Sequence, residues 1–165
     1  MEHVTSRHNA VVKRFRETAR QGRLGETVLL DGAHLLGEAL ESRVDLDTVV
    51  FAADAAAGRL AGLANRCAAA GARVLTVSDA LLATISPVRQ PSGVVSLAHI
   101  SSTPLEDALA VGPPQHVVFL DGVQDPGNVG AIIRTAEACG ATAVVAGAGT
   151  ADPYSWKALR GRMGS

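Results

Sequence analysis

Apolar and polar residues follow one another in a regular pattern over the first hundred positions of the chain. Short runs rich in Val and Leu are typical of buried strands, while longer segments with an apolar residue at every third or fourth position are typical of amphipathic helices. Strands are predicted at residues 27–31, 48–52, 73–77 and 93–98. Helices are predicted at residues 9–21, 33–41, 55–70 and 79–85. Because helices and strands alternate at this spacing, we expect an α/β fold with a mostly parallel sheet and helices on both faces.

The pattern changes at residues 101–114, which contain polar residues and prolines and end in Gly112-Pro113-Pro114. This segment is typical of a linker with room for one helical turn. Beyond it the pattern predicts a strand at 116–121, a helix at 128–139 and a strand at 143–146. A strand–helix–strand unit of this size cannot cover both faces of its own sheet. We therefore expect either a fragment of a larger domain or strands that pair with the first sheet or with a partner chain.

Composition excludes several classes of protein. The chain has 165 residues, a net charge of −1, 47% apolar residues and only 3% aromatic residues, so its core must consist mostly of Val, Leu and Ala. This composition is not that of a disordered chain. The sequence contains no run of about 18 apolar residues, as a membrane span requires, and its first residues lack the apolar stretch of a signal peptide. Its two cysteines, Cys67 and Cys139, form no CxxC pattern, and we expect them to be small core residues. We expect a cytoplasmic protein without a metal site.

Basic residues concentrate at the two ends of the chain. Six of the 15 Lys and Arg residues lie in the first 25 positions, where only Glu2 and Glu17 oppose them, and three more lie at 157–162. On a nearly neutral protein this distribution favours local contact with a polyanion, although a solvated helix face would carry the same charges. The candidates for this contact are Arg7, Asn9, Lys13, Arg14, Arg16 and Arg20. Of these, Arg7 and Asn9 are equally suited to flank and cap the first helix.

The segment between the last two predicted strands carries the most informative motif. A buried strand leads into the turn Asp125-Pro126-Gly127, and Asn128 is placed to cap the helix that follows. Gly127, Gly130 and Arg134 share one helix face, which we expect to be bare next to the backbone. Open α/β sheets bind ligands at the carboxyl ends of their strands, so this face is a candidate site; a capped helix with a surface arginine is the alternative. A dinucleotide-binding loop fits less well, because the glycines do not follow the GxGxxG spacing.

The sequence from Asp121 to Ala136 resembles the first signature motif of the SpoU family, the RNA 2′-O-ribose methyltransferases of the SPOUT superfamily. Residues that resemble the family's amino-terminal substrate-binding domain, itself similar to ribosomal proteins that bind kinked RNA, lie at 5–9, 13–14, 31–32 and 91–95. The resemblance implies an α/β/α RNA-binding domain at 1–100, a linker at 101–114 and, at 115–165, the first β-α-β part of a SPOUT domain, which normally forms a trefoil knot. It also implies S-adenosylmethionine as cofactor, a homodimer, and RNA as partner, with ribosomal RNA favoured over transfer RNA.

By resemblance, Asn128 and Arg134 are the catalytic residues, and Arg134 is the residue assigned to activate the ribose 2′-hydroxyl. A guanidinium is a poor proton acceptor because its pKa lies above about 12. We therefore expect Arg134 to stabilise the developing alkoxide, with Glu137 either orienting it or forming a plain surface pair. Trp156 and Arg162 stand where the family usually has Pro and Ser. We expect Trp156 to stack on a base or to pack in a dimer interface.

The chain also departs from the family pattern. Position 31 is Asp where the family more often has Glu, and the second and third signature motifs, which supply most of the methyl-donor pocket, are absent. We therefore expect a fragment that is too short to thread a knot and that is inactive by itself. Three functions stay open: a piece of a SpoU-type methyltransferase, an RNA-binding module without chemistry, and an unrelated nucleotide-binding α/β protein.

Overall fold

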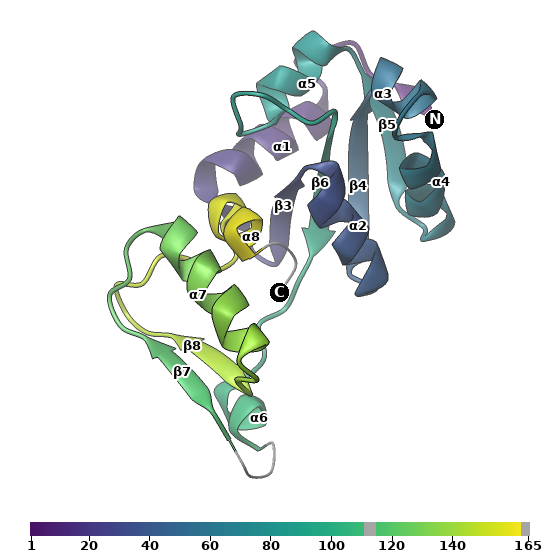
Figure 1. The fold of residues 1–165 in the computed structure, drawn as a ribbon. Helices are drawn as coiled ribbons and strands as arrows, with labels where there is room; N and C mark the ends of the chain where they lie inside the picture. Colours follow the sequence, from purple (N-terminus) through teal and green to yellow (C-terminus); the bar gives the residue numbers. More distant parts are fainter. Residues whose placement is uncertain (111–114, 163–165) are drawn as a thin grey trace. The chain divides into compact units, whose positions relative to one another are not determined.

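The computed structural model of the chain describes residues 1–110 and 115–162. The chain forms two compact units, Met1–Ile100 and Ser101–Ser165 (Figure 1). The first unit is built on a six-stranded sheet with the strand order β1-β5-β4-β6-β3-β2. Its strands are β1 (Glu2–His3), β2 (Arg23–Leu24), β3 (Thr27–Asp31), β4 (Asp45–Ala52), β5 (Arg73–Val77) and β6 (Val94–His99).

The sheet of the first unit is mixed, so the prediction of a mostly parallel sheet is wrong. Strand β5 is parallel to β1 and β4, whereas β6 is antiparallel to both of its neighbours, β3 and β4, and β2 is antiparallel to β3. The helix before β6, α5 (Asp79–Ile85), has 7 residues and is about 10 Å long. A six-residue strand is roughly 20 Å long, so this helix is too short to lead the chain back to the opposite end of the sheet, as a parallel strand would require. The residue after that helix, Ser86, still donates a hydrogen bond to Asp31 at the carboxyl end of β3 (2.6 Å). Strand β6 therefore starts at this end of the sheet and runs in the opposite direction.

Helices cover both faces of this sheet, as predicted. Helices α1 (Ala10–Gln21) and α5 (Asp79–Ile85) lie on one face, and α2 (Ala33–Glu41), α3 (Ala53–Ala57) and α4 (Ala61–Ala69) lie on the other (Figure 1). The core between these layers is aliphatic apart from two phenylalanines. Its largest fully buried side chains include Phe15, Phe51, Leu29, Leu36, Leu75, Leu82, Ile85 and Leu97. Cys67 is fully buried among them, as predicted.

The predicted helix at 55–70 is two helices, α3 and α4. Gly58 ends α3 with φ −111° and ψ −115°, and the buried Leu60 precedes α4. An alanine-rich segment has a uniformly high helix propensity, so the sequence pattern does not reveal this break. The two-residue strands β1 and β2 were not predicted either, because two residues carry no periodicity.

The second unit contains a two-stranded parallel sheet and three helices in its described residues. Its elements are α6 (Leu105–Leu109), β7 (Val117–Leu120), α7 (Pro126–Ala138), β8 (Ala143–Ala146) and α8 (Trp156–Arg162). Helix α6 is the single turn expected in the linker, while the predicted break at Gly112-Pro113-Pro114 lies outside the described residues. Helix α8 was not predicted.

The second unit leaves more apolar surface exposed than the first. Phe119 on β7 is 62% exposed and Val117 is 39% exposed. Cys139 is the C-cap of α7 and is also exposed, so its predicted place in the core is wrong. A groove of about 410 Å³ beside α7 is lined by Val118, Ala131, Ile132, Thr135, Ala136 and Cys139. Among the described residues, no helix is both long and apolar enough to cross a membrane.

Candidate functional site

The turn from β7 into α7 is organised by Asp125. This residue is the N-cap of α7, and its Oδ1 accepts a hydrogen bond from the backbone N–H of Asn128 (2.9 Å). Pro126 occupies the first helical position, where its fixed φ suits a helix and its missing N–H costs nothing. The prediction that Asn128 caps the helix is therefore wrong, because the carboxylate three residues earlier takes that role. Asn128 instead lies in the first turn, and its side chain is exposed.

The carboxylate of Asp125 is also paired with α8. Its Oδ2 lies 3.3 Å from Nζ of Lys157, and both side chains are about half exposed. The hydrogen bond from Asn128, followed by the contact with Lys157, holds the pKa of Asp125 below its usual value. Asp125 is therefore a carboxylate at neutral pH and favours the positive amino-terminal end of α7.

The sequence suggested that Gly130 lies on a bare face of α7. This prediction is wrong, because α8 covers Gly130. A Cβ atom at this position would overlap the carbonyl oxygen of Ala158 and lie 2.9 Å from the backbone nitrogen of Arg162. On the opposite helix, a Cβ atom at Gly161 would lie 3.1 Å from the carbonyl oxygen of Gly127. The glycines thus serve the close crossing of α7 and α8. Arg134, one turn beyond Gly130, is exposed.

Asn128 and Arg134 lie on α7 six positions apart, which is about 9 Å along the helix axis. They are therefore about 1.7 turns apart on the helix that follows β7, and their side chains leave the helix about 120° from each other. The exposed Asn128 offers a side-chain amide that donates and accepts hydrogen bonds, and the exposed Arg134 offers a planar cation. Asn128 lies close to the carboxyl end of β7, whereas Arg134 lies further along α7.

The loops that follow β7 and β8 are bonded to each other. The carbonyl oxygen of Leu120 accepts hydrogen bonds from the N–H of Gly147 (2.8 Å) and the hydroxyl of Thr150 (2.9 Å). The N–H of Ala151 donates to the carbonyl of Val123 (2.8 Å). The ring of Phe119 occupies the space that a side chain at position 147 would need, because its Cζ lies 2.6 Å from an added Cβ. These contacts join the carboxyl ends of the two strands and the loops that follow them.

Arg162, the last residue of α8, is half-buried. Burial lowers its pKa, while the nearby charges of Tyr154 and Glu137 raise it, and its guanidinium carbon lies 6.0 Å from the centre of the Tyr154 ring. The sequence did not suggest that the charge of Glu137 raises the pKa of Arg162. Trp156 is half-buried in the first turn of α8.

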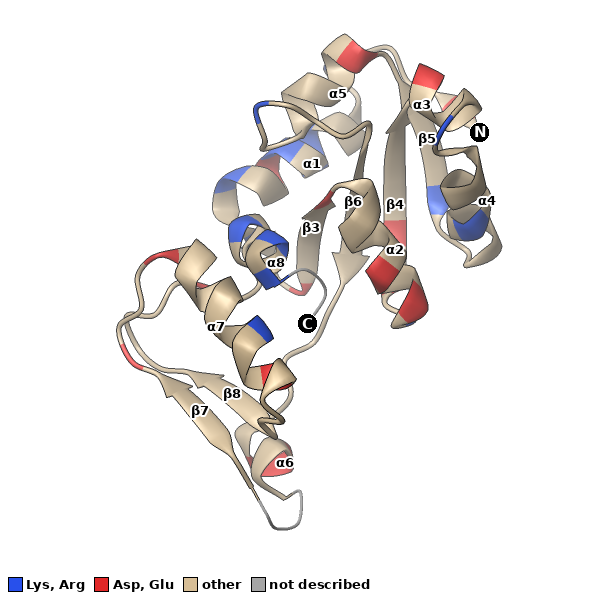
Figure 2. Ribbon diagram, in the orientation of Figure 1, with Lys and Arg blue, Asp and Glu red and all other residues tan. Residues whose placement is uncertain are grey.

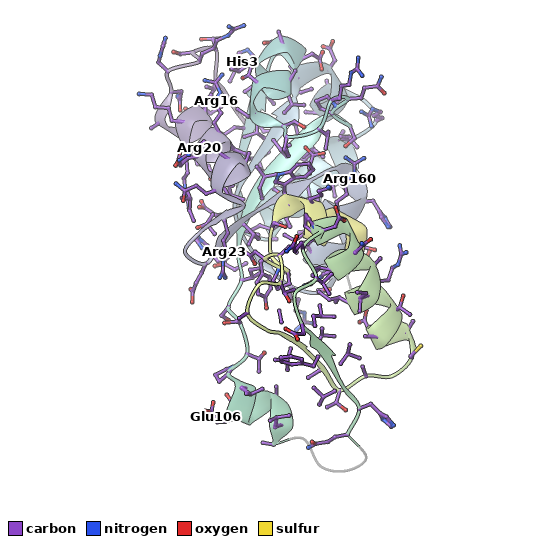
Figure 3. All side chains as sticks on the ribbon, turned by 90° about the vertical axis from the view of Figure 1, so that its left-hand side faces the viewer. His3, Arg16, Arg20, Arg23, Glu106 and Arg160 are labelled. Atoms are coloured by element: carbon purple, nitrogen blue, oxygen red, sulfur yellow. The ribbon has the colours of Figure 1, made fainter. Side chains whose placement is uncertain are left out.

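The basic residues of the amino-terminal region gather on α1 (Figure 2). Arg16, Arg20 and Arg23 follow one another along one side of the first unit (Figure 3). Arg16 and Arg20 differ in the protein groups to which their guanidinium groups are bonded. Arg16 donates through Nε to the carbonyl of Thr84 (3.2 Å), and Arg20 pairs with Glu17 through Nη2 and Oε1 (2.5 Å).

The other candidates lie on α1 or just before it, and they also fall into two groups. Arg14 forms an ion pair with Asp47, and Asn9 caps α1 by accepting a hydrogen bond from the N–H of Val11 (2.8 Å). Lys13 and Arg7 have exposed side chains. Lys13, Arg16 and Arg20 thus share one face of α1, Arg14 points to a different side, and Arg7 and Asn9 precede the helix. Arg14 and Arg16 help to hold the first unit together. Among residues 1–110 and 115–162, no group of three His, Cys, Asp or Glu side chains is placed to hold a metal ion.

Two family models match the sequence of this chain. The model described as the SpoU rRNA Methylase family matches residues 115–165, and the model described as the MRM3-like substrate binding domain matches residues 9–96. Among known proteins, the chain is similar to the 23S rRNA (guanosine(2553)-2'-O)-methyltransferase RlmP of Bacillus subtilis. The identity is 30% over 167 residues, which cover 100% of this chain and 62% of that protein.

Solved structures give the same picture. The chain superposes on an rRNA methyltransferase from Sinorhizobium meliloti with a TM-score of 0.82 and 32% identity, over 99% of this chain and 61% of that one. For the AdoMet-bound rRNA methyltransferase from Sinorhizobium meliloti, the TM-score is 0.81 and the identity is 31%, over 99% of this chain and 60% of that one. The chain thus spans about three fifths of the length of these relatives.

Proposed function

Since this chain belongs to the SpoU family of RNA methyltransferases and carries an MRM3-like substrate-binding domain, we propose that it works as part of an enzyme that methylates a ribose 2′-hydroxyl of ribosomal RNA. The observation that carries the proposal is the exposure of Asn128 and Arg134, within the family's motif, on a helix that follows a strand of a parallel sheet. Similarity to rRNA methyltransferases along nearly the whole chain supports the same function.

The role of Arg134 follows from its chemistry. In this reaction a bond forms between the 2′-oxygen and the methyl carbon, the bond between that carbon and the donor sulfur breaks, and the hydroxyl loses its proton. A guanidinium stays protonated at physiological pH, so Arg134 cannot accept that proton. It is suited to stabilise the negative charge that develops on the 2′-oxygen, while the proton leaves through a phosphate or water. Asn128 supplies a side-chain amide that helps to orient the substrate.

The methyl donor that we propose is S-adenosylmethionine, the ligand named in one of the Sinorhizobium meliloti structures. The described residues do not by themselves build a pocket for it. The backbone groups of Gly147, Thr150 and Ala151 at the carboxyl edge of the sheet already have partners within the protein, and the ring of Phe119 fills the space beside Gly147. We propose that residues which the longer relatives carry beyond the matched three fifths complete the pocket, and that the 165-residue chain alone is inactive.

The RNA-binding part of the proposal concerns the first unit. We propose that residues 1–100 bind RNA through the exposed Lys13, Arg20 and Arg7, and that residues 115–165 form the first part of a SPOUT domain with its trefoil knot. We further propose a homodimer in the cytoplasm that acts on ribosomal rather than transfer RNA.

A second function, RNA binding without chemistry, is favoured by the match of the substrate-binding model to residues 9–96 and by the incomplete donor pocket.

The test of the catalytic proposal is the variant Arg134→Ala in the complete enzyme. Loss of one preorganised donor to a developing charge costs on the order of 3 kcal/mol, or a hundredfold or more in rate. Single-turnover methylation at saturating RNA and donor measures this rate, and the affinity for the donor should change far less. Arg134→Lys should restore little activity, because an ammonium does not reproduce the planar guanidinium.

The matched control is Arg66→Ala, which removes an exposed arginine paired with Glu41 at 3.7 Å in the first unit. This variant should keep the wild-type rate. A rate within about threefold of wild type for Arg134→Ala would contradict its catalytic role and would leave the chemistry to Asn128 and to residues beyond this chain. Absence of methyl transfer by the complete wild-type protein would favour the non-catalytic RNA-binding function.

A further inference from the structure

We propose that Lys157 is a positioning residue, which holds the carboxylate of Asp125 and through it the first turn of α7 that carries Asn128. The importance of this positioning role for methyl transfer rests on the function proposed above. The contact itself is a property of the second unit and can be tested without RNA or donor.

The two oxygens of the Asp125 carboxylate have different partners. Oδ1 accepts the N–H of Asn128 at 2.9 Å, and Oδ2 accepts Nζ of Lys157 at 3.3 Å. A Cβ atom at Gly127 would lie 2.9 Å from Oδ1, so the carboxylate occupies the space of a side chain at that position. Rotation of the carboxylate away from Lys157 would withdraw Oδ1 from Asn128. The lysine therefore selects the orientation in which the first turn of α7 is capped.

The position of Lys157 is itself fixed by backbone packing. It lies in the first turn of α8, where the N–H of Ala158 bonds to the hydroxyl of Ser155 (3.4 Å). Helix α8 in turn lies against α7 at Gly130 and Gly161, where backbone atoms approach closely. The flexible lysine side chain is thus anchored at a defined place beside the cap of α7.

An exposed ion pair contributes little to global stability, and the side chains of this pair are 53% and 51% exposed. Loss of the pair should therefore loosen the first turn of α7 without unfolding the protein. This separates a positioning role from a general structural role.

The experiment is nuclear magnetic resonance on the 165-residue chain with the variant Lys157→Met. The pKa of Asp125, which Asn128 and Lys157 hold below its usual value, should rise in the variant. The amide of Asn128 should exchange with solvent about three- to tenfold faster, since its acceptor is less well oriented. The melting temperature should not change. In the variant Lys157→Arg, the pKa of Asp125 and the exchange rate of the Asn128 amide should stay close to their wild-type values, because arginine keeps a positive charge within reach of Oδ2.

The matched control is Arg160→Met, which removes one positive charge from the next turn of the same helix and changes an exposed side chain. It should leave the Asp125 titration and the Asn128 amide at their wild-type values. The proposal is wrong if Lys157→Met changes neither value, or if Arg160→Met changes both equally, which would indicate a general effect of charge. Such a failure would leave the proposed methyl transfer intact, and failure of the Arg134 test would leave this positioning role intact.

Discussion

Gly130 lies where α8 crosses α7, and its missing side chain determines how closely the two helices approach. An added methyl group would overlap the carbonyl oxygen of Ala158 and would also lie 3.0 Å from the carbonyl carbon of Gly161. These are backbone atoms, which cannot rotate out of the way as the end of a side chain can. Any larger residue at position 130 must therefore displace α8 as a whole, and with it Lys157.

We expect Gly130→Ala to destabilise the second unit by about 1–3 kcal/mol, because the clash exceeds the gain of roughly 1 kcal/mol in helix propensity. Denaturant unfolding followed by the fluorescence of Trp156, the single tryptophan, measures this, since Trp156 lies in α8.

Gly37→Ala is the matched control in α2, because an added Cβ there meets nothing within 4 Å. It should stabilise the first unit by up to about 1 kcal/mol in far-ultraviolet circular dichroism. A neutral or stabilising effect of Gly130→Ala would contradict the close crossing of the two helices.

At the scale of the element, α1 combines two kinds of basic residue. The guanidinium of Arg16 donates to the carbonyl of Thr84 at 3.2 Å and to that of Arg7 at 3.5 Å, and thereby joins α1 to the end of α5. Lys13 is exposed on the same helix, and among the described residues no partner is found for its ammonium group. Both residues looked alike in the sequence, but only Lys13 is available to bind a phosphate without losing a contact in the protein.

We therefore expect the variants Lys13→Ala and Arg16→Ala to differ. If Lys13 contacts a phosphate, its loss should lower the slope of log affinity for RNA against log salt by roughly 0.7–0.9. Arg16→Ala should leave this slope unchanged and destabilise the first unit by about 1 kcal/mol. Filter binding over a range of salt concentrations, together with thermal unfolding, distinguishes the two. Equal slopes for wild type and Lys13→Ala would contradict an RNA contact at this residue.

Elements with a strong local signal were predicted correctly. The strands at Thr27–Asp31 and Arg73–Val77 and the helix Ala33–Glu41 have the predicted limits, because each combines a clear apolar pattern with a local stop signal. Direction and pairing are not local. That β6 lies antiparallel between β3 and β4 follows from the short α5 and from the bond between Ser86 and Asp31, which join residues far apart in the sequence.

The helix that carries the candidate residues was predictable from the sequence, but its packing was not. The motif led to Asn128 and Arg134 on a helix after a parallel strand, and the structure places them there. The cap at Asp125 was missed, although an aspartate directly before a proline is a recognisable start signal. The burial of Gly130 was not predictable, since it depends on α8, whose short sequence shows no clear amphipathic pattern.

At the scale of the whole molecule, the two units differ in how completely they bury their sheets. In the first unit, Val94, Val95, Ser96, Leu97 and Ala98 of β6 are 0% exposed. In the second unit, α7 covers one face of the β7–β8 sheet, and Phe119 on the other face is 62% exposed. A parallel sheet is normally covered on both faces. The described residues of the second unit therefore do not enclose a ligand at the exposed face of this sheet.

We therefore expect the 165-residue chain not to bind S-adenosylmethionine at micromolar concentrations. Isothermal calorimetry with the purified chain measures this. The positive control is the rRNA methyltransferase from Sinorhizobium meliloti that has an AdoMet-bound structure, of which the chain spans 60%. A micromolar dissociation constant for the 165-residue chain would show that another surface forms the donor pocket.

The central position of β6 also constrains how the first unit comes into being. This strand is the last of its sheet to be synthesised, yet it separates β3 from β4 and pairs with both along their length. Until the ribosome has released residues up to His99, β3 and β4 lack their common neighbour, and their apolar side chains have no finished core to enter. Strands β1, β5 and β4 can pair before that point, but β3 joins the same sheet only after β6 has emerged, so the sheet is completed late in the synthesis of the unit.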